Sequence, residues 1–186
     1  MADGAIEEPV LCVDLDGTLS KGDSTLRQGW RLVLTRPWLA PAIAWWIRDG
    51  RGRVKDELAR RVPYDNVSWR YNRALIVWLR ERRADGRRLV LASGSDHRVV
   101  AEVARRLDLF DEFLASDGET NFIGASKAAG LAARFGVFDY VGNSRKDVAV
   151  WRLARQCYLV ANNAALRSWL ARRIKFTRVF PGDWTN

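Results

Sequence analysis

Two aspartates, Asp14 and Asp16, stand one residue apart at the end of an apolar run that begins at Val10. Burying an unpaired carboxylate is costly, so this pair implies a compensating cation or a phosphate chemistry. The carboxylate of Asp14 can attack phosphorus and form an aspartyl-phosphate. The carboxyl group of Asp16, carried on the following turn, can protonate a leaving oxygen and then deprotonate water. The pair alone also suits a helix cap or a surface turn, so other residues must decide.

Polar residues of a complementary kind occur further along the chain. Ser93 and Gly94 follow the apolar residues 89–92 and can hold phosphoryl oxygens through a hydroxyl and a backbone N–H group. Lys127, at the start of a helical pattern, can offset the charge that develops during phosphoryl transfer. Each signal is weak by itself, because turns with serine and solvated helical lysines are common. Their order and spacing together predict one phosphoryl-transfer site.

Carboxylates beside a phosphate repel one another unless a hard cation lies among them. Mg²⁺ suits this task, because it takes a few protein oxygen ligands and completes its shell with phosphate and water. Asn143 and Asp147, which follow the apolar residues 138–142, can join Asp14 and Asp16 as ligands. Asn143 also suits a simple capping role on the helix that holds Asp147. We therefore expect a magnesium site formed by these four residues.

From residue 87 onward, the predicted elements that carry these residues alternate between strands and helices. Apolar runs predict strands, and residues with helical periodicity separate them. Functional residues of a parallel sheet collect at the carboxyl ends of its strands. We predict an α/β fold with a Rossmann-like parallel sheet flanked by helices. After the first run at 10–13, the strands are expected at 87–93, 112–116, within 138–144 (a strand that passes into a loop), at 157–160 and at 175–180, and the helices at 96–110, 126–136, 145–156 and 163–173.

A long stretch between the first two strands contains no strand-like run. Helical patterns occupy 24–35, 37–50, 52–62 and 68–85, and prolines and glycines separate them. We predict a small all-helical cap at 23–85, inserted after the first strand, and an α/β core domain formed by 1–22 and 86–186.

Four motifs of this chain resemble those of the haloacid dehalogenase (HAD) superfamily, whose members are mostly Mg²⁺-dependent phosphatases. They are "DLDGTL" (14–19), "LVLASGS" (89–95), "SKAAGL" (126–131) and "YVGNSRKD" (140–147). The insert lies where the superfamily's C1-type caps lie. The resemblance implies that Asp14 is the nucleophile and a metal ligand, and that Asp16 is the acid/base and touches the metal through its backbone carbonyl. It further implies that Ser93 and Lys127 bind the phosphoryl group and that Asp147 holds Mg²⁺ directly or through water.

The fourth motif departs from the superfamily pattern. Most relatives have an aspartate where this chain has Asn143. An amide oxygen can still bind Mg²⁺, but one negative charge is lost, which weakens the expected metal site. The expected function is a Mg²⁺-dependent phosphomonoester hydrolase. The alternative is a non-catalytic HAD-like module that docks on a membrane surface or a protein partner.

A narrower resemblance concerns the HAD domain that is often fused to UbiA-type polyprenyl transferases. It is carried by "RPWL" (36–39), "ASDGETNFIGASKAAGL" (115–131) and "VGNSRKDVAVWRLAR" (141–155). The chain would then be a stand-alone version or an excised domain. This resemblance implies a UbiA-type prenyltransferase as partner or fusion, and a substrate such as a 5-phosphoribosyl-polyprenyl-phosphate or another phosphorylated metabolite.

Composition adds two expectations about partners. The formal net charge of +9 comes mostly from arginine and favours an anionic partner, although a merely solvated basic surface explains it equally well. The cap tryptophans suit either an internal cap core or an interfacial, membrane-facing surface. No nucleic-acid motif is present. These tryptophans are Trp30, Trp38, Trp45, Trp46, Trp69 and Trp78.

The expected location is the cytoplasm, with peripheral contact to the inner face of the membrane as an option. The first ten residues lack the basic start and apolar core of a signal peptide. The longest uncharged apolar stretch, 37–47, is far shorter than the ~20 residues that a spanning helix needs. Cys12 and Cys157 lie in strand-like apolar runs, which predicts reduced core cysteines.

Overall fold

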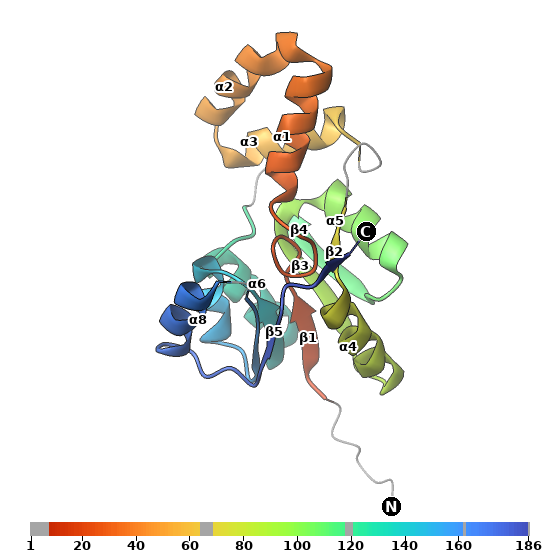
Figure 1. Cartoon of the computed structure of the whole chain (residues 1–186), viewed down its shortest axis with the longest axis vertical. Coiled ribbons are helices and arrows are strands. Elements are labelled where there is room, and N and C mark those ends of the chain that lie inside the picture. Colours follow the sequence, from red (N-terminus) through yellow and green to blue (C-terminus); the bar gives the residue numbers. More distant parts are fainter. Residues whose placement is uncertain (1–7, 64–68, 118–120, 162, 186) are drawn as a thin grey trace, which may run out of the picture.

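The computed structural model describes residues 8–63, 69–117, 121–161 and 163–185. The expected terminal segment 1–7 and the start of the expected helix at Ser68 lie outside these residues. Figure 1 shows two parts, an α/β body and a group of helices that stands over one edge of its sheet.

Six strands form one sheet in the order β4-β3-β1-β5-β6-β7, and every neighbouring pair is parallel. This confirms the predicted α/β class and its parallel sheet. Because β1 is central, its carboxyl end lies between those of β3 and β5. The strands are β1 (Val10–Val13), β3 (Leu89–Asp96), β4 (Glu112–Ser116), β5 (Phe138–Gly142), β6 (Cys157–Val160) and β7 (Arg178–Phe180).

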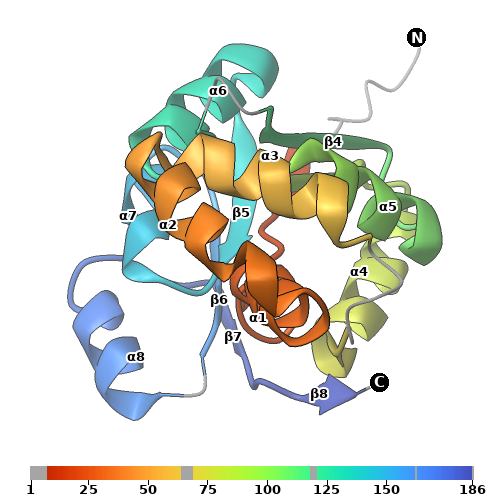
Figure 2. The same ribbon diagram turned by 90° about the horizontal axis from the view of Figure 1, so that it is seen from above.

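Helices cover both faces of the sheet, as the view from above in Figure 2 shows. Alternate residues of each strand point to opposite faces, so each strand contributes to both cores. Leu11 and Val13 pack with α4 (Arg73–Ala84) and α5 (His97–Leu107) on one face. Val10 and Cys12 pack with α6 (Ala125–Phe135), α7 (Val148–Trp151) and α8 (Ala164–Ala171) on the other. Each face therefore has its own apolar core, and the sheet is buried between them.

The predicted cap span of 23–85 contains helices that pack in two different ways. The first group, called the cap below, consists of α1 (Ser24–Thr35), the 3₁₀ turn η1 (Pro37–Leu39), α2 (Ala40–Arg48) and α3 (Arg51–Arg61), which surround a separate core. Helix α4, by contrast, contributes Leu75, Trp78 and Leu79 to the core on the sheet. Within the predicted span of 23–85, α4 therefore differs from the other helices, because its apolar stripe is buried against the strands; the boundary between cap and core stays a prediction.

Two local predictions differ from the structure. Residues 71–72, expected to be helical, form the short strand β2 (Tyr71–Asn72), which pairs antiparallel with β8 (Trp184–Thr185). The helix expected at 145–156 is reduced to the 3₁₀ turn η3 (Arg145–Asp147) and the four residues of α7.

The six tryptophans of the predicted cap divide between the two environments that the sequence allowed, a buried core and an exposed surface. Trp46 is buried in the cap core and Trp78 is buried on the sheet, while Trp69 packs partly buried beside both cores. Trp30, Trp38 and Trp45 expose 61–71% of their surface to solvent.

Both cysteines are buried and free, as predicted. Burial raises the pKa of the Cys12 thiol to about 12 and that of Cys157 to about 11, so both thiols stay protonated at neutral pH. Among the described helices, none combines the length and the apolar character that crossing a bilayer requires.

Candidate active site

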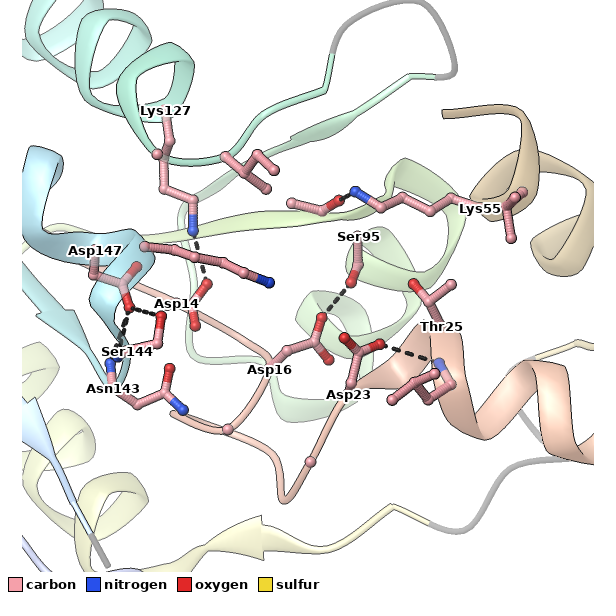
Figure 3. A pocket seen from close by; sticks show the side chains of 18 of the residues that line it. Asp14, Asp16, Asp23, Thr25, Lys55, Ser95, Lys127, Asn143, Ser144 and Asp147 are labelled. Carbon is pink, nitrogen blue, oxygen red and sulfur yellow. Dashed lines mark hydrogen bonds and ion pairs between the residues drawn. The ribbon is translucent and has the colours of Figure 1, made fainter. Parts of the chain in front are cut away.

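A cavity of about 640 Å³ opens at the carboxyl edge of the sheet, between β1, β3 and β5 and under the cap (Figure 3). This is the edge at which parallel α/β folds bind ligands. The polar residues of its lining are Asp14, Asp16, Asp23, Thr25, Lys55, Ser95, Lys127, Asn143, Ser144, Lys146 and Asp147; the apolar ones are Leu26, Ile47, Val54 and Ile123; and four glycines, Gly17, Gly22, Gly94 and Gly124, complete it.

Asp14 follows the last residue of β1 and is 7% exposed. One carboxylate oxygen accepts a hydrogen bond from Lys127 Nζ at 2.7 Å, and the other accepts one from Thr18 Oγ1 at 3.0 Å. Burial raises the pKa of Asp14, and the neighbouring ammonium group opposes this shift. The carboxylate is therefore oriented at the cavity wall and compensated by one cation.

A tight turn after β1 carries Asp16 toward the cap. Gly17 adopts a φ of 76°, and an added Cβ there would lie 2.0 Å from Asn143 Nδ2, so this turn requires glycine. One carboxylate oxygen of Asp16 accepts the Ser24 N–H at 2.8 Å, and the other accepts from the Ser24 and Ser95 hydroxyls. Burial raises the pKa of Asp16 while these hydrogen bonds oppose the shift. A raised pKa favours the protonated form that a general acid needs.

Lys127, in the first turn of α6, is 3% exposed and points at the end of β1. Besides Asp14, its Nζ donates to the Ala92 carbonyl at 3.0 Å and to the Tyr140 hydroxyl at 3.1 Å. Burial acts to lower the pKa of Lys127, but the negative charges of Asp14 and its neighbours raise it overall. The side chain is thus a fixed ammonium group at the floor of the cavity.

Asp147 lies after β5 in the turn η3. One of its carboxylate oxygens accepts a hydrogen bond from the Tyr140 hydroxyl at 2.8 Å. The other accepts the N–H groups of Asn143 and Ser144 and the Ser144 hydroxyl at 2.9–3.1 Å. Asn143 lines the same cavity, and its side chain lies against Gly17. As the sequence indicates, the fourth motif presents one oriented carboxylate, Asp147, and one amide, Asn143, at this cavity.

The two residues expected to hold phosphoryl oxygens occupy different positions. Gly94 lines the cavity, and an added Cβ would lie 2.2 Å from Ile123 Cγ2. Ser93 is fully buried, is not part of the lining, and accepts the Ser95 N–H at its Oγ. Its phosphate-binding role stays a prediction, and Ser95 presents the hydroxyl at this wall.

Sequence reasoning missed several contributors. Thr18, Ser95 and Tyr140 stand inside the quoted motifs, so hydroxyl groups beside the predicted carboxylates are the signal that could have found them. Ser24 and Lys55 come from the cap. Lys55 Nζ donates to the Gly94 carbonyl and, at 2.8 Å, to Asn121 Oδ1, which brings α3 to the cavity; no sequence pattern marked it.

The donor set suits Mg²⁺ in kind. Asp14, Asn143 and Asp147 present hard oxygen atoms to one cavity, and a Mg²⁺ site needs only one or two carboxylates besides phosphate and water. Within the described residues, no three acidic, histidine or cysteine side chains form a ready metal cluster. Lys127 and Tyr140 occupy much of the hydrogen-bonding capacity of the two carboxylates.

No protein-family model matches the chain. No curated protein matches it either. Similar solved structures exist, however. A protein of unknown function from Bordetella pertussis Tohama I superposes with a TM-score of 0.64 at 17% identity, covering 92% of this chain and 97% of its own.

Two further solved structures carry functional names. A HAD-family hydrolase from Salmonella enterica serovar Typhi has a TM-score of 0.63 at 14% identity, over 94% of this chain and 68% of its own. A substrate-bound phosphoserine phosphatase has a TM-score of 0.63 at 13% identity, over 95% and 94%. The chain therefore shares its fold with a HAD-family hydrolase and a phosphatase, at identities of 14% and 13%.

Proposed function

We propose that the protein is a phosphomonoester hydrolase that acts through an aspartyl-phosphate on Asp14. The observation that carries this proposal is that the buried carboxylate of Asp14, the partly buried carboxylate of Asp16 and the ammonium group of Lys127 meet at the carboxyl edge of a HAD-like sheet. Such a set provides a nucleophile, an acid/base and a fixed positive charge within one cavity.

The reaction divides into two steps. In the first, a carboxylate oxygen of Asp14 bonds to phosphorus, the ester P–O bond breaks, and the protonated Asp16 gives its proton to the leaving alcohol. In the second, Asp16 takes a proton from water, the water oxygen bonds to phosphorus, and the Asp14–phosphorus bond breaks. Inorganic phosphate leaves, and both carboxyl groups return to their starting states.

Three groups position this chemistry. Thr18 and Lys127 hold the two oxygens of Asp14, so the carboxylate keeps one orientation while it attacks. The position of Gly94 in the cavity wall requires glycine, because an added Cβ would lie 2.2 Å from Ile123 Cγ2, and its backbone N–H is the proposed donor to a phosphoryl oxygen. Lys127 stabilises the negative charge of the transferring group.

The cofactor of this proposal is Mg²⁺. Its protein ligands would be Asp14, Asn143 and Asp147, with the Asp16 carbonyl implied by the motif resemblance. When bound, the ion screens the carboxylates from the phosphate and favours nucleophilic attack. Asn143 supplies a neutral ligand, so we expect weaker Mg²⁺ binding than an aspartate would give, and Asn143→Asp should strengthen it.

The cavity lining supports a substrate with an apolar group beside its phosphate. Leu26, Ile47 and Val54 from the cap and Ile123 from the body line the same cavity. A 5-phosphoribosyl-polyprenyl-phosphate would have this chemistry. A UbiA-type prenyltransferase as partner or fusion is supported by the motif resemblance in the sequence.

The test is a hydrolysis assay of the purified full chain with an aryl phosphate and a panel of phosphate monoesters in Mg²⁺. Asp14→Asn should lower kcat by roughly a thousandfold or more, because asparagine cannot form the covalent intermediate. Mass spectrometry of acid-quenched wild-type protein should locate phosphate on the peptide that contains Asp14.

Asp49→Asn is the matched control. Asp49 follows α2, is exposed and does not line the cavity, so the same change from carboxylate to amide is made away from the site. This variant should keep its activity. Activity that survives Asp14→Asn would exclude the mechanism, and a folded wild type without activity on any ester would favour the non-catalytic binding module.

A further inference from the structure

Helix α1 exposes an apolar stripe that the fold leaves uncovered. Leu26, Trp30 and Leu34 recur every four residues and therefore lie on one side of the helix. They are 65%, 69% and 75% exposed, and Trp38 in η1 is 71% exposed. The buried residues of α1 are Ser24, Gln28 and Leu32, which form the opposite stripe. The cap core is thus complete without the outer stripe.

The distribution of such residues is uneven. Six of the ten exposed large hydrophobic side chains among the described residues fall within 26–47. The other four are scattered over separate elements of the α/β body: Val77, Phe113, Val137 and Leu153. Isolated exposed apolar residues are ordinary, whereas a concentration of them marks a surface that contacts another apolar phase or a partner.

The same region is strongly basic. Residues 24–63 contain nine arginines and lysines but only three acids. Two of these acids, Asp56 and Glu57, already form ion pairs with arginines. Arg31 and Arg36 are exposed beside the stripe, and neither forms an ion pair with a described residue. Their positive charge is available to an external anion.

We propose that the cap tip docks on the surface of a bilayer that contains anionic lipids. The cap tip is defined as Trp30, Arg31, Leu34, Arg36 and Trp38. Tryptophan suits the boundary between headgroups and acyl chains, and the arginine guanidinium binds lipid phosphate while its stem stays apolar. Figure 1 shows that the segment between α1 and α2 is the part of the cap remote from the sheet, where a flat surface can reach it.

The neighbouring helix α2 repeats this composition. Trp45 is 61% exposed, and the Arg48 guanidinium lies over its ring at 5.1 Å. An arginine beside an exposed tryptophan again joins a phosphate-binding cation to an interfacial ring. Because two consecutive elements of the cap share this pattern, the charge complementarity with an anionic lipid surface extends beyond α1.

The stripe also reaches the cavity. Leu26, at the foot of the stripe, is exposed and lines the cavity, and Ile47 of α2 does both as well. Docking through the cap tip would therefore keep the cavity mouth connected to the bilayer by an apolar path. This docking does not require the proposed phosphatase activity, because lipid binding is measured without any turnover.

The test is co-sedimentation of the full chain with vesicles of phosphatidylcholine, alone or mixed with phosphatidylglycerol, at low and at physiological salt. The wild type should bind the anionic vesicles and release as salt rises. Replacing both Trp30 and Trp38 by serine should weaken binding roughly tenfold or more, because two interfacial rings are lost. Replacing both Arg31 and Arg36 by glutamine should weaken it by roughly thirtyfold at low salt.

Two matched pairs serve as controls. Val137→Ser with Leu153→Ser removes exposed apolar side chains from the body, and Arg80→Gln with Arg172→Gln removes the same charge from exposed sites. Both control pairs should bind vesicles like the wild type. All substituted side chains are exposed, so circular dichroism and Tm should stay unchanged and exclude misfolding as the cause.

Three outcomes would overturn the proposal. The first is a wild type that ignores anionic vesicles at low salt. The second is an equal loss of binding in the tip variants and in the control pairs. The third is a tip-dependent association with a second copy of the chain, with a protein, or with single-stranded RNA, in the absence of vesicle binding.

Discussion

At the residue scale, the candidate site is a chain of hydrogen bonds between charged groups. Lys127 joins Asp14 to Tyr140, and Tyr140 joins Lys127 to Asp147, all within the buried floor of the cavity. Burial raises the pKa of Tyr140 well above its ordinary value, so its hydroxyl keeps the proton that it donates to Asp147. A single phenol therefore orients both the cation and the second carboxylate.

Tyr140→Phe removes that hydroxyl and keeps the ring. We expect kcat, and the affinity for Mg²⁺, to fall by roughly tenfold each, because residues that orient ligand groups contribute to that extent. The measurement is the initial rate as a function of Mg²⁺ concentration. Tyr158→Phe is the control, since its hydroxyl contacts Gln156 instead. Equal rates for Tyr140→Phe and the wild type would exclude this positioning role.

At the element scale, α3 ties the cap to the α/β body beside the cavity. Lys55 donates to the Gly94 carbonyl, and the next residue, Asp56, forms an ion pair with Arg98 of α5. Arg98 is itself held by Asp96 at the end of β3, with Nε at 2.9 Å. The cap is thus fastened by two adjacent side chains whose partners lie at one strand end.

Asp56→Asn should loosen this connection. We expect amide hydrogen exchange in α3 to become about fivefold faster, which corresponds to the ~1 kcal/mol of a good partly exposed ion pair. Asp49→Asn is the control, because Asp49 is exposed and forms no ion pair with the described residues. Unchanged exchange in α3 would show that this ion pair does not hold the cap.

The ion pair between Asp56 and Arg98 also makes the stability of the cap depend on pH. Burial acts to raise the pKa of Asp56, but hydrogen bonds from Arg98 and Arg60 lower it below the ordinary 3.8. A lowered folded-state pKa means that the stabilisation is complete above the unfolded value and is lost as pH falls through the folded value. The difference in amide exchange rate of α3 between the wild type and Asp56→Asn should therefore persist above pH 3.8 and disappear as the pH falls below this value.

At the scale of the whole molecule, three apolar cores contribute unequally to the stability of the fold. Two lie on opposite faces of the sheet and share its strands, while the third is confined to the cap. Because α4 is packed on the sheet, its apolar residues support the global fold. The cap core, anchored mainly through α3, can open without exposing the strands.

Leu79→Ala in α4 and Leu32→Ala in α1 test this division. Leu79 is fully buried on the sheet, so its truncation should cost about 2–5 kcal/mol of unfolding free energy and lower Tm by roughly 4–20 °C. Leu32→Ala should speed exchange in α1–α3 and leave the amides of β1 and β3 unchanged. Val77→Ala, half-exposed on α4, is the control and should shift Tm little. If both leucine variants speed amide exchange in β1 and β3 to the same extent, the cap and the body unfold as one unit.

The sequence alone determined the parallel sheet, the chain order of its six strands and the carboxylates at its edge. Strand periodicity and helical periodicity are local properties, so the runs at 112–116 and 157–160 are strands at the predicted residues. Asp14, Asp16, Lys127, Asn143 and Asp147 meet in one cavity because parallel strands bring their carboxyl ends to a common edge.

The tertiary structure alone decided which neighbours complete that site. The β3–β4 register shifts between Ala92 and Asp96, and at this irregular strand end Ser95, not Ser93, lines the cavity. Lys55 reaches Gly94 only because α3 folds over the sheet edge, and α4 joins the body because its apolar stripe finds strands to cover. These outcomes depend on packing between segments distant in sequence, which no local pattern of residues encodes.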